Sequence, residues 1–327
     1  MNFKSCVEEY KECINSGLRD YVSGLVDCNE KLIDSIKYSL MSGGKRIRGI
    51  LLLAFFELFG GRKEDAIPFA CAIEMLHTYS LIHDDLPCMD NDDIRRGKPS
   101  NHRVYGEDIA LLAGDALLTM AFEVLSNQNL ADKFGAEKII RVCKILSFSA
   151  GAQGMVSGQA DDLSMEVGNH GTEEIFKMYK KKTGMLIESS AEIGAVLSEN
   201  DESKLALVKN YGRNVGLAFQ LVDDLLDVVG QEEIIGKPVG SDISNKKFTY
   251  ISVFGIEQTR DKIKKLTQDS LDILNKLGGN NEFLKCLTKQ LETRIRWNCT
   301  LIKNRRMNTN GVWKSKQNKH TKGFRKN

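Results

Sequence analysis

Residues 220–227 read Gln-Leu-Val-Asp-Asp-Leu-Leu-Asp, and residues 81–86 read Leu-Ile-His-Asp-Asp-Leu. Each stretch places paired carboxylates inside an apolar segment with helical spacing. An ionised carboxylate loses hydration among aliphatic side chains, and neither stretch contains a local cationic partner. A divalent metal would compensate this cost, and Mg²⁺ prefers carboxylate oxygens while leaving positions open for phosphate oxygens. Either cluster alone is equally well explained as a solvated acidic helix end.

The second cluster predicts a straight ligand face on a helix. Asp223 and Asp227 are four residues apart and therefore share a face, with Asp224 beside them. Gln220 lies one turn earlier on the same side. These side chains can share metal ions without any distortion of the backbone.

The first cluster needs a turn of the chain. Asp84 and Asp90 are six residues apart, which a straight helix would place on different faces. Pro87 disfavours helical backbone at Leu86, so we expect the chain to turn there and return Asp90 from a loop. His77 lies two turns before Asp84 on the same face, although a lone histidine in such a place is more often a core residue.

Apolar residues recur at spacings of three and four along most of the chain, and convincing alternating strands are absent. There are only four prolines, so few residues interrupt long helices. We therefore predict an all-α, single-domain bundle of about ten or more long helices around a central active-site cavity. The predicted helices cover residues 3–16, 28–41, 45–59, 65–86, 107–127, 134–167, 172–197, 202–229, 249–277 and 281–293.

Cysteine usage and hydropathy indicate a cytoplasmic protein. The eight cysteines form no CxxC pair, which favours small buried side chains in a reducing compartment. The longest apolar run, residues 50–56, is far shorter than the roughly 20 residues of a membrane span. The N-terminus lacks the pattern of a signal peptide.

The net charge of +2 conceals an asymmetry. No acid follows Glu292, whereas eleven of the 46 Lys and Arg residues do, so residues 1–292 carry 35 bases and 44 acids. This break divides the chain into a domain over residues 1–295 and a basic tail over residues 296–327. The tail has few apolar residues, and we expect it to be disordered.

Cationic residues cluster near segment ends. The stretch Gly43-Gly44-Lys45-Arg46-Ile47-Arg48 places Lys45 and Arg48 three apart at an expected helix start, where anions bind well. It lacks the spacing of a P-loop. Each cationic group alone is explained as solvated surface, but together they predict two bound anionic groups. Besides Lys45 and Arg48, the cationic residues in question are Arg95, Arg96, Lys180, Lys181, Lys182, Lys237, Lys246 and Lys247.

These motifs resemble the trans-isoprenyl diphosphate synthases, and most closely the bacterial-type farnesyl diphosphate synthases. Residues 84–99, Asp-Asp-Leu-Pro-Cys-Met-Asp-Asn-Asp-Asp-Ile-Arg-Arg-Gly-Lys-Pro, look like the first aspartate-rich motif of that family, and residues 220–227 look like the second. The remaining blocks match in order over residues 30–292. They are Gly43 to Arg48, His77, Lys182-Thr183, Lys237 and Lys247-Phe248-Thr249-Tyr250.

The resemblance implies a role for each matching residue. Mg²⁺, three ions by the family pattern, would be held on an allylic diphosphate by Asp84, Asp85, Asp90, Asp223, Asp224 and Asp227. The same diphosphate would contact Arg95, Lys182 and Lys247, with Lys237 nearby. Isopentenyl diphosphate would bind to Lys45, Arg48, His77 and Arg96. The allylic cation would form beside Thr183 and Gln220.

The implied activity is a prenyl transfer by a homodimer. Isopentenyl diphosphate would condense head-to-tail with dimethylallyl or geranyl diphosphate to give trans-farnesyl diphosphate, through ionisation, 1′–4 condensation and proton elimination. Metals and lysines would stabilise the charge that develops on the departing diphosphate. That diphosphate would also accept the proton, so no side-chain base is needed.

Product length would depend on the residues one turn below Asp84. Tyr79 and Ser80 lie there. An aromatic residue at this position resembles the residue that forms the floor of the product cavity, and so stops chain growth, in the C15-forming members. The simpler explanation is an ordinary core tyrosine. Synthesis of geranylgeranyl or geranyl diphosphate is therefore the alternative.

Three other functions compete with this one. Class I terpene cyclases have a mixed Asn/Asp, Ser/Thr and Glu second motif and bind one diphosphate, whereas this chain has Asp-Asp-x-x-Asp and Lys45, Arg48 and Arg96 for a second anion. Inactive regulatory subunits lose carboxylates, but all six are present. The basic tail could tether the chain to nucleic acid or an anionic membrane, yet no nucleic-acid module is recognisable.

Overall fold

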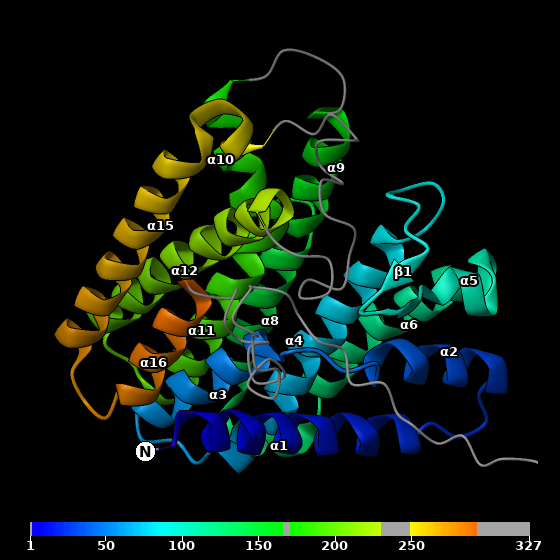
Figure 1. Cartoon of the computed structure of the whole chain (residues 1–327). Coiled ribbons are helices and arrows are strands. Elements are labelled where there is room, and N and C mark those ends of the chain that lie inside the picture. The colour runs from blue at the N-terminus through cyan, green and yellow to red at the C-terminus, as the bar shows by residue number, and fades with distance from the viewer. Residues whose placement is uncertain (1, 166–170, 230–248, 293–327) are drawn as a thin grey trace, which may run out of the picture.

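The apolar segment Ile-Arg-Gly-Ile-Leu-Leu-Leu-Ala-Phe-Phe-Glu-Leu forms helix α3 (Ile47–Leu58) at the centre of the fold. Its residues from Ile47 to Phe56 are all buried. The equally apolar α11 (Met185–Ser198) packs along it, and residues 186–197 are buried as well. Helices that are apolar on every side require neighbours all round, and the other helices supply them. The result is an all-α bundle, as predicted (Figure 1).

The computed structural model describes residues 2–165, 171–229 and 249–292. The first half contains α1 (Phe3–Ser23), α2 (Glu30–Leu40), α3, α4 (Lys63–Asp84), α5 (Asn101–Tyr105), α6 (Glu107–Leu125), α7 (Gln128–Phe134) and α8 (Ala136–Ala150). The second half contains α9 (Met155–Met165), α10 (Thr172–Tyr179), the π-helical turn η1 (Lys180–Gly184), α11, α12 (Glu202–Val229), α15 (Tyr250–Leu277) and α16 (Glu282–Glu292).

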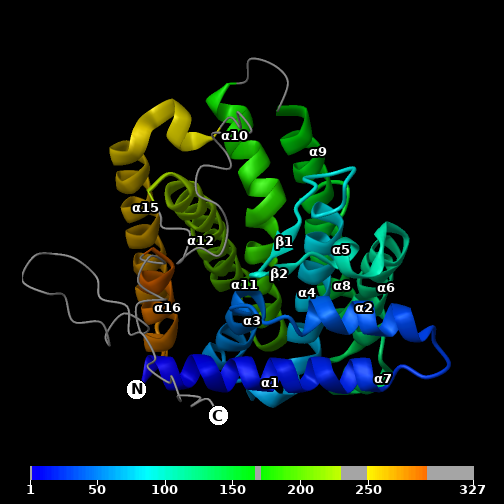
Figure 2. The ribbon, with the colours of Figure 1, turned by 45° about the vertical axis from the view of Figure 1, so that its right-hand side comes forward.

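The bundle has two different ends (Figures 1 and 2). Helix α1 crosses one end. Helices α9 and α10 lie toward the other end, together with a two-stranded hairpin of β1 (Ile94–Arg95) and β2 (Lys98–Pro99). The strands are antiparallel, and Arg95 pairs with Lys98. The sequence predicted no strands here.

The prediction for the first helix, residues 3–16, was too short. Helix α1 continues through Gly17 to Ser23 because the glycine allows close packing against α4. A Cβ atom at Gly17 would lie 2.7 Å from Cγ2 of Ile67 and 2.8 Å from Sγ of Cys71.

Two predicted helices are interrupted. The helix predicted over residues 134–167 is divided into α8 and α9, with the break at residues 151–154, and α7 ends where it was predicted to begin. The helix predicted over residues 172–197 contains η1, which widens the backbone at Lys180–Gly184. Such π-helical insertions are frequent at functional sites.

One long apolar helical stretch occurs among the described residues. Residues Ala136–Met165 are long and apolar enough to cross a membrane, and the bent pair α6–α7 passes the same test. These criteria use only length and composition, and core helices also satisfy them. Helix α8 packs against α11.

A buried ion pair fixes the glycine-rich segment before α3. Arg46 has a φ of 52° and is buried, and its Nη1 lies 3.3 Å from Oε2 of Glu74 on α4. Its other nitrogens donate to Oδ1 of Asn15 at 3.0 Å and to the carbonyl of Leu40 at 2.5 Å. Glu74 also accepts from the amide of Gly49 at 3.0 Å. The pair therefore joins α1, α2, α3 and α4 at one point.

Replacing Glu74 with Ala should lower the free energy of unfolding by about 3–5 kcal/mol, because it leaves a buried guanidinium without its counter-charge. Denaturation followed by circular dichroism measures this change. The matched control is Glu8→Ala, which removes the exposed pair with Lys11 and should cost less than about 1 kcal/mol. Equal effects of the two substitutions would contradict this account of Arg46.

Candidate active site

A cavity of about 510 Å³ lies between α4, α9, η1 and α12. Helix α3 contributes Arg48 to its wall. The η1 turn contacts both α9 and α12. Asp84 and Asp223 reach the cavity from α4 and α12, whereas Leu163 and Phe219 make part of its apolar wall. The cavity therefore combines an acidic region with space for an apolar group.

The first acidic cluster turns back as expected from Pro87. Helix α4 ends at Asp84, and the amide of Met89 donates to the carbonyl of Leu86 at 2.8 Å. The amide of Asp90 then donates to the carbonyl of Asp84 at 2.9 Å. The turn brings the backbones of the two aspartates together at the C-terminal end of α4.

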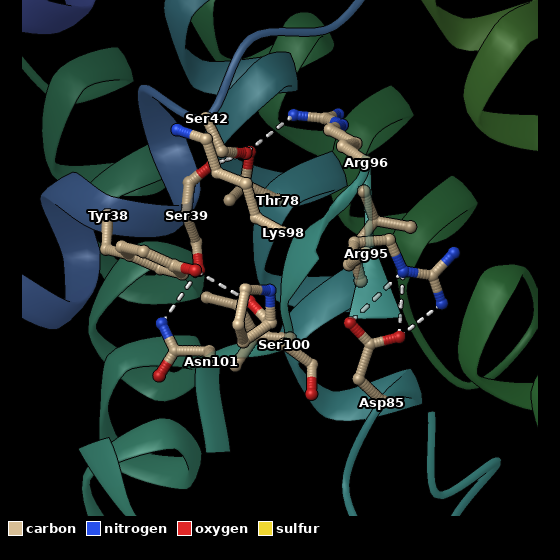
Figure 3. A pocket seen from close by; sticks show the side chains of 13 residues that line it. Tyr38, Ser39, Ser42, Thr78, Asp85, Arg95, Arg96, Lys98, Ser100 and Asn101 are labelled. Carbon is tan, nitrogen blue, oxygen red and sulfur yellow. Dashed lines mark hydrogen bonds and ion pairs between the residues drawn. The ribbon is translucent and has the colours of Figure 1, made fainter. Parts of the chain in front are cut away.

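The second aspartate of this cluster is bound inside the protein. Asp85 is only 2% exposed, and Nε of Arg95 donates to its Oδ1 at 2.8 Å (Figure 3). Nη2 of Arg95 contacts the same carboxylate and also lies 3.3 Å from Oδ2 of Asp92. Burial raises the pKa of Asp85, although Arg95 opposes the shift. Asp85 thus holds Arg95, while Asp84 lines the cavity.

The hairpin that carries Arg95 is fixed on α2 (Figure 3). The hydroxyl of Tyr38 donates to the carbonyl of Pro99 at 2.7 Å. Nδ2 of the buried Asn101 donates to Oγ of Ser39 at 2.7 Å and to the carbonyl of Ser35 at 2.9 Å. These bonds hold the arginines of the hairpin against the bundle.

The second acidic cluster likewise has one aspartate that lines the cavity and another that is bound inside the protein. Asp223 lines the cavity, and Asp227 is half-buried one turn further along α12. Asp224 is 3% exposed and accepts hydrogen bonds from the hydroxyl of Tyr179 and from Nε2 of Gln220, the latter at 3.1 Å. Oγ1 of Thr183 donates to Oε1 of Gln220 at 2.9 Å. This chain of bonds connects α12 with η1.

The residues predicted to bind anions differ in their exposure to solvent. Arg48 is buried and lines the cavity with His77, whereas Lys45 is exposed. Burial, followed by the positive charges of Arg48 and Arg96, holds the pKa of His77 well below its ordinary value. Its imidazole is therefore neutral at pH 7 and can serve as a hydrogen-bond donor and acceptor.

Arg96 is placed by the glycines of the segment before α3. Its Nη1 donates to the carbonyl of Gly43 at 2.5 Å. Gly44 has a φ of 121°, and a Cβ atom there would lie 2.9 Å from Cζ of Arg96. The absence of a side chain at position 44 therefore makes room for this guanidinium.

Three polar residues of the site were missed by the sequence analysis. Nε2 of Gln159 donates to Oδ1 of Asp84 at 2.5 Å, Oδ2 of Asp162 lies 2.6 Å from Nζ of Lys182, and Tyr179 contacts Asp224. The run Gln-Ala-Asp-Asp over residues 159–162, inside an expected helix, was a usable signal.

Lys182 stands between two carboxylates. Its Nζ is 3.7 Å from Oδ1 of Asp84, beyond the closer contact with Asp162. Burial disfavours the ammonium, but the charges of Asp84 and Asp162 outweigh burial and raise the pKa of Lys182. Lys182 is therefore charged at the edge of the cavity.

Other predicted residues lie outside the part of the chain that the structure describes. They are Lys237, Lys246, Lys247 and the tail over residues 296–327. The neighbouring Thr249 is described, and it caps α15 by accepting a hydrogen bond from the amide of Ser252 at 3.3 Å.

The donor set suits a hard cation. Both acidic clusters provide carboxylate oxygens as possible ligands, and Asp84 and Asp223 line one cavity. Within residues 2–165, 171–229 and 249–292, no three His, Cys, Asp or Glu side chains form a ready-made metal centre. Mg²⁺ is usually bound by one or two carboxylates together with water and substrate phosphate oxygens. The cavity fits that mode of binding.

Known proteins share these features. A model of the polyprenyl synthetase family matches residues 29–279. Farnesyl diphosphate synthase of Bacillus subtilis (strain 168) is 42% identical over 259 residues, which cover 79% of this chain and 87% of that protein. Geranylgeranyl pyrophosphate synthase 4 of Arabidopsis thaliana is 43% identical over 276 residues, which cover 84% and 73%.

A solved structure agrees with the sequence relatives. The crystal structure of a geranyltransferase from Helicobacter pylori, complexed with magnesium and isoprenyl diphosphate, is similar with a TM-score of 0.76 and 32% identity. The similarity covers 88% of this chain and 97% of that one. The chain therefore belongs to the polyprenyl synthetase family and is a trans-isoprenyl diphosphate synthase, as its motifs predicted.

Proposed function

We propose that this prenyltransferase condenses isopentenyl diphosphate with dimethylallyl and geranyl diphosphates to give trans-farnesyl diphosphate. The observation that carries this proposal is one cavity with Asp84 and Asp223, Arg48 and His77, and an apolar wall. Such a cavity can hold two diphosphate groups and one growing hydrocarbon chain. Relatives are named as farnesyl and as geranylgeranyl synthases, so geranylgeranyl diphosphate is the alternative product.

The allylic diphosphate would bind at the acidic region. Asp84 and Asp223, with Asp90 and Asp227 beside them, would hold Mg²⁺. Asp85 and Asp224, which the sequence also assigned to Mg²⁺, would instead position Arg95 and Gln220. Bound Mg²⁺ would stabilise the negative charge that develops on the departing diphosphate. The H. pylori enzyme, whose structure contains magnesium, supports this choice. Lys182 and Arg95 would add positive charge, with Lys237 and Lys247 proposed from sequence alone.

Isopentenyl diphosphate would bind at the start of α3. Arg48 and Arg96 offer two guanidinium groups, and the exposed Lys45 lies in the same segment. Guanidinium groups bind phosphate oxygens in pairs of parallel hydrogen bonds. The neutral His77 can donate a further hydrogen bond without adding charge.

The reaction would then occur between the two sites. Carbon–oxygen cleavage would leave an allylic cation beside the oxygens of Thr183 and Gln220, which are already bonded to each other. The double bond of isopentenyl diphosphate would attack the cation, and the departed diphosphate would accept the proton. The apolar wall excludes water that would otherwise trap the cation.

Asp84→Asn and Asp223→Asn should each lower kcat/KM by at least about a hundredfold, because each removes a charge that compensates the transition state. Both should also raise the Mg²⁺ concentration that gives half-maximal rate. Initial rates with labelled isopentenyl diphosphate measure these effects. Asp161→Asn is the control, since Asp161 pairs with Lys181 at 2.8 Å and does not line the cavity. Wild-type kinetics in both cavity variants would refute the metal assignment.

Product length is proposed to depend on Tyr79 and Ser80. Both line the cavity, and Tyr79 is 6% exposed. Tyr79→Ala removes a ring from the wall, so we expect products longer than those of the wild type by at least one isoprene unit. Reversed-phase chromatography of the dephosphorylated products measures this, with Tyr105→Ala, an aromatic outside the cavity, as control. An unchanged product distribution would show that Tyr79 does not limit product length.

A homodimer is proposed from exposed apolar side chains on neighbouring helices. Five of the nine exposed large hydrophobic residues of the described chain lie on α6, α8 and α9. They are Leu111, Leu112, Ile140, Phe148 and Val156. Apolar groups gathered in this way are typical of a surface covered by a partner, and a second copy could use the same surface on both sides.

The double substitution Leu112→Glu and Phe148→Glu should convert the dimer to monomers, because it would bury charge at the shared surface. Light scattering after size exclusion measures the mass. The control is Val26→Glu, which alters a residue that is 76% exposed and follows the C-terminal end of α1. A monomeric wild type, or a double variant that stays dimeric, would refute this surface.

A further inference from the structure

His83 lies one residue before Asp84 and has no part in the function proposed above. It lines the cavity together with Tyr79, which precedes it by one helical turn on α4. The two rings are packed edge to face, with centroids 5.6 Å apart and an interplanar angle of 85°. Tyr79 therefore has an aromatic neighbour that restricts where its own ring can lie.

The ring of His83 is itself fixed from the opposite side. Its Nε2 is 2.9 Å from the carbonyl oxygen of Leu111 on α6. A carbonyl oxygen can only accept, so Nε2 carries the proton and donates it. Oδ1 of Asp115 lies 3.9 Å from the same nitrogen. The imidazole thus connects the last turn of α4 to α6.

A glycine on α6 makes room for this ring. A Cβ atom at Gly114 would lie 2.0 Å from Nε2 of His83 and 2.3 Å from its Cδ2. No side chain fits there while the ring keeps its place. The ring is therefore fixed by a hydrogen bond at its tip, by the glycine beneath it and by Tyr79 at its edge.

We propose that His83 is a positioning residue for product length. Its hydrogen bond to α6 fixes the imidazole, and the imidazole fixes the ring of Tyr79 in the cavity wall. This inference rests on the proposed function and extends the determinants of chain length from the cavity wall to α6. Gly114 takes part without lining the cavity.

The test compares two amide substitutions of one side chain. In His83→Gln the amide nitrogen can occupy the place of Nε2 and bond to Leu111, whereas in His83→Asn it is too short to reach. We expect His83→Asn to raise the ratio of longer to wild-type product by about tenfold, the equivalent of losing one aromatic contact. His83→Gln loses the same aromatic contact but keeps the bond to α6, so its ratio should rise clearly less than that of His83→Asn. An unchanged ratio in His83→Asn, or an equal rise in both variants, would overturn the proposal.

Gly114→Ala provides a second test that substitutes no cavity-lining residue. The new methyl group must displace the imidazole, so the product ratio should shift. The matched control is Gly17→Ala, which crowds α4 at Ile67 and Cys71 and should leave the ratio unchanged. A shift in both glycine variants, or in neither, would overturn the proposal. If the wild-type protein consumed no isopentenyl diphosphate, the proposed function itself would fail, which is a separate outcome.

Discussion

The site depends on how the protein compensates the buried charges at the C-terminal end of α4. Each buried ionic group there requires an opposite charge or a hydrogen bond. Asp85 is paired with Arg95, and Asp224 is bonded to Tyr179. Asp84 and Asp223 line the cavity beside them, and Asp84 is bonded to Gln159. The protein thus buries one aspartate of each cluster and places another in the cavity wall.

The rest of the fold presents this polar region above an apolar space. The buried Arg46–Glu74 pair joins four helices and fixes the start of α3, from which Arg48 reaches the cavity. Below the acids, α4 turns Tyr79 and His83 toward the cavity and toward α6. In the proposed function, successive turns of one helix would bind the diphosphate and limit the length of the hydrocarbon. Product length could then change without change to the polar region.

Much of this architecture could be predicted from local patterns. The apolar spacing predicted an all-α fold, and the proline at position 87 predicted the turn that returns Asp90 to Asp84. The interruption of helix at residues 151–154 and in η1 was not predicted, since apolar spacing is present on both sides of each short segment. Gln159 was missed because its bond to Asp84 joins residues 75 positions apart. Contacts of that kind depend on how helices pack, which periodicity does not contain.

In the proposed reaction, one cavity ionises an allylic diphosphate beside isopentenyl diphosphate. Incubation of the wild-type protein with labelled isopentenyl diphosphate and dimethylallyl diphosphate, with and without Mg²⁺, followed by product chromatography, tests this reaction. We expect Mg²⁺-dependent incorporation of label into an all-trans C15 diphosphate. Failure to consume isopentenyl diphosphate in the presence of Mg²⁺ would contradict the proposed reaction.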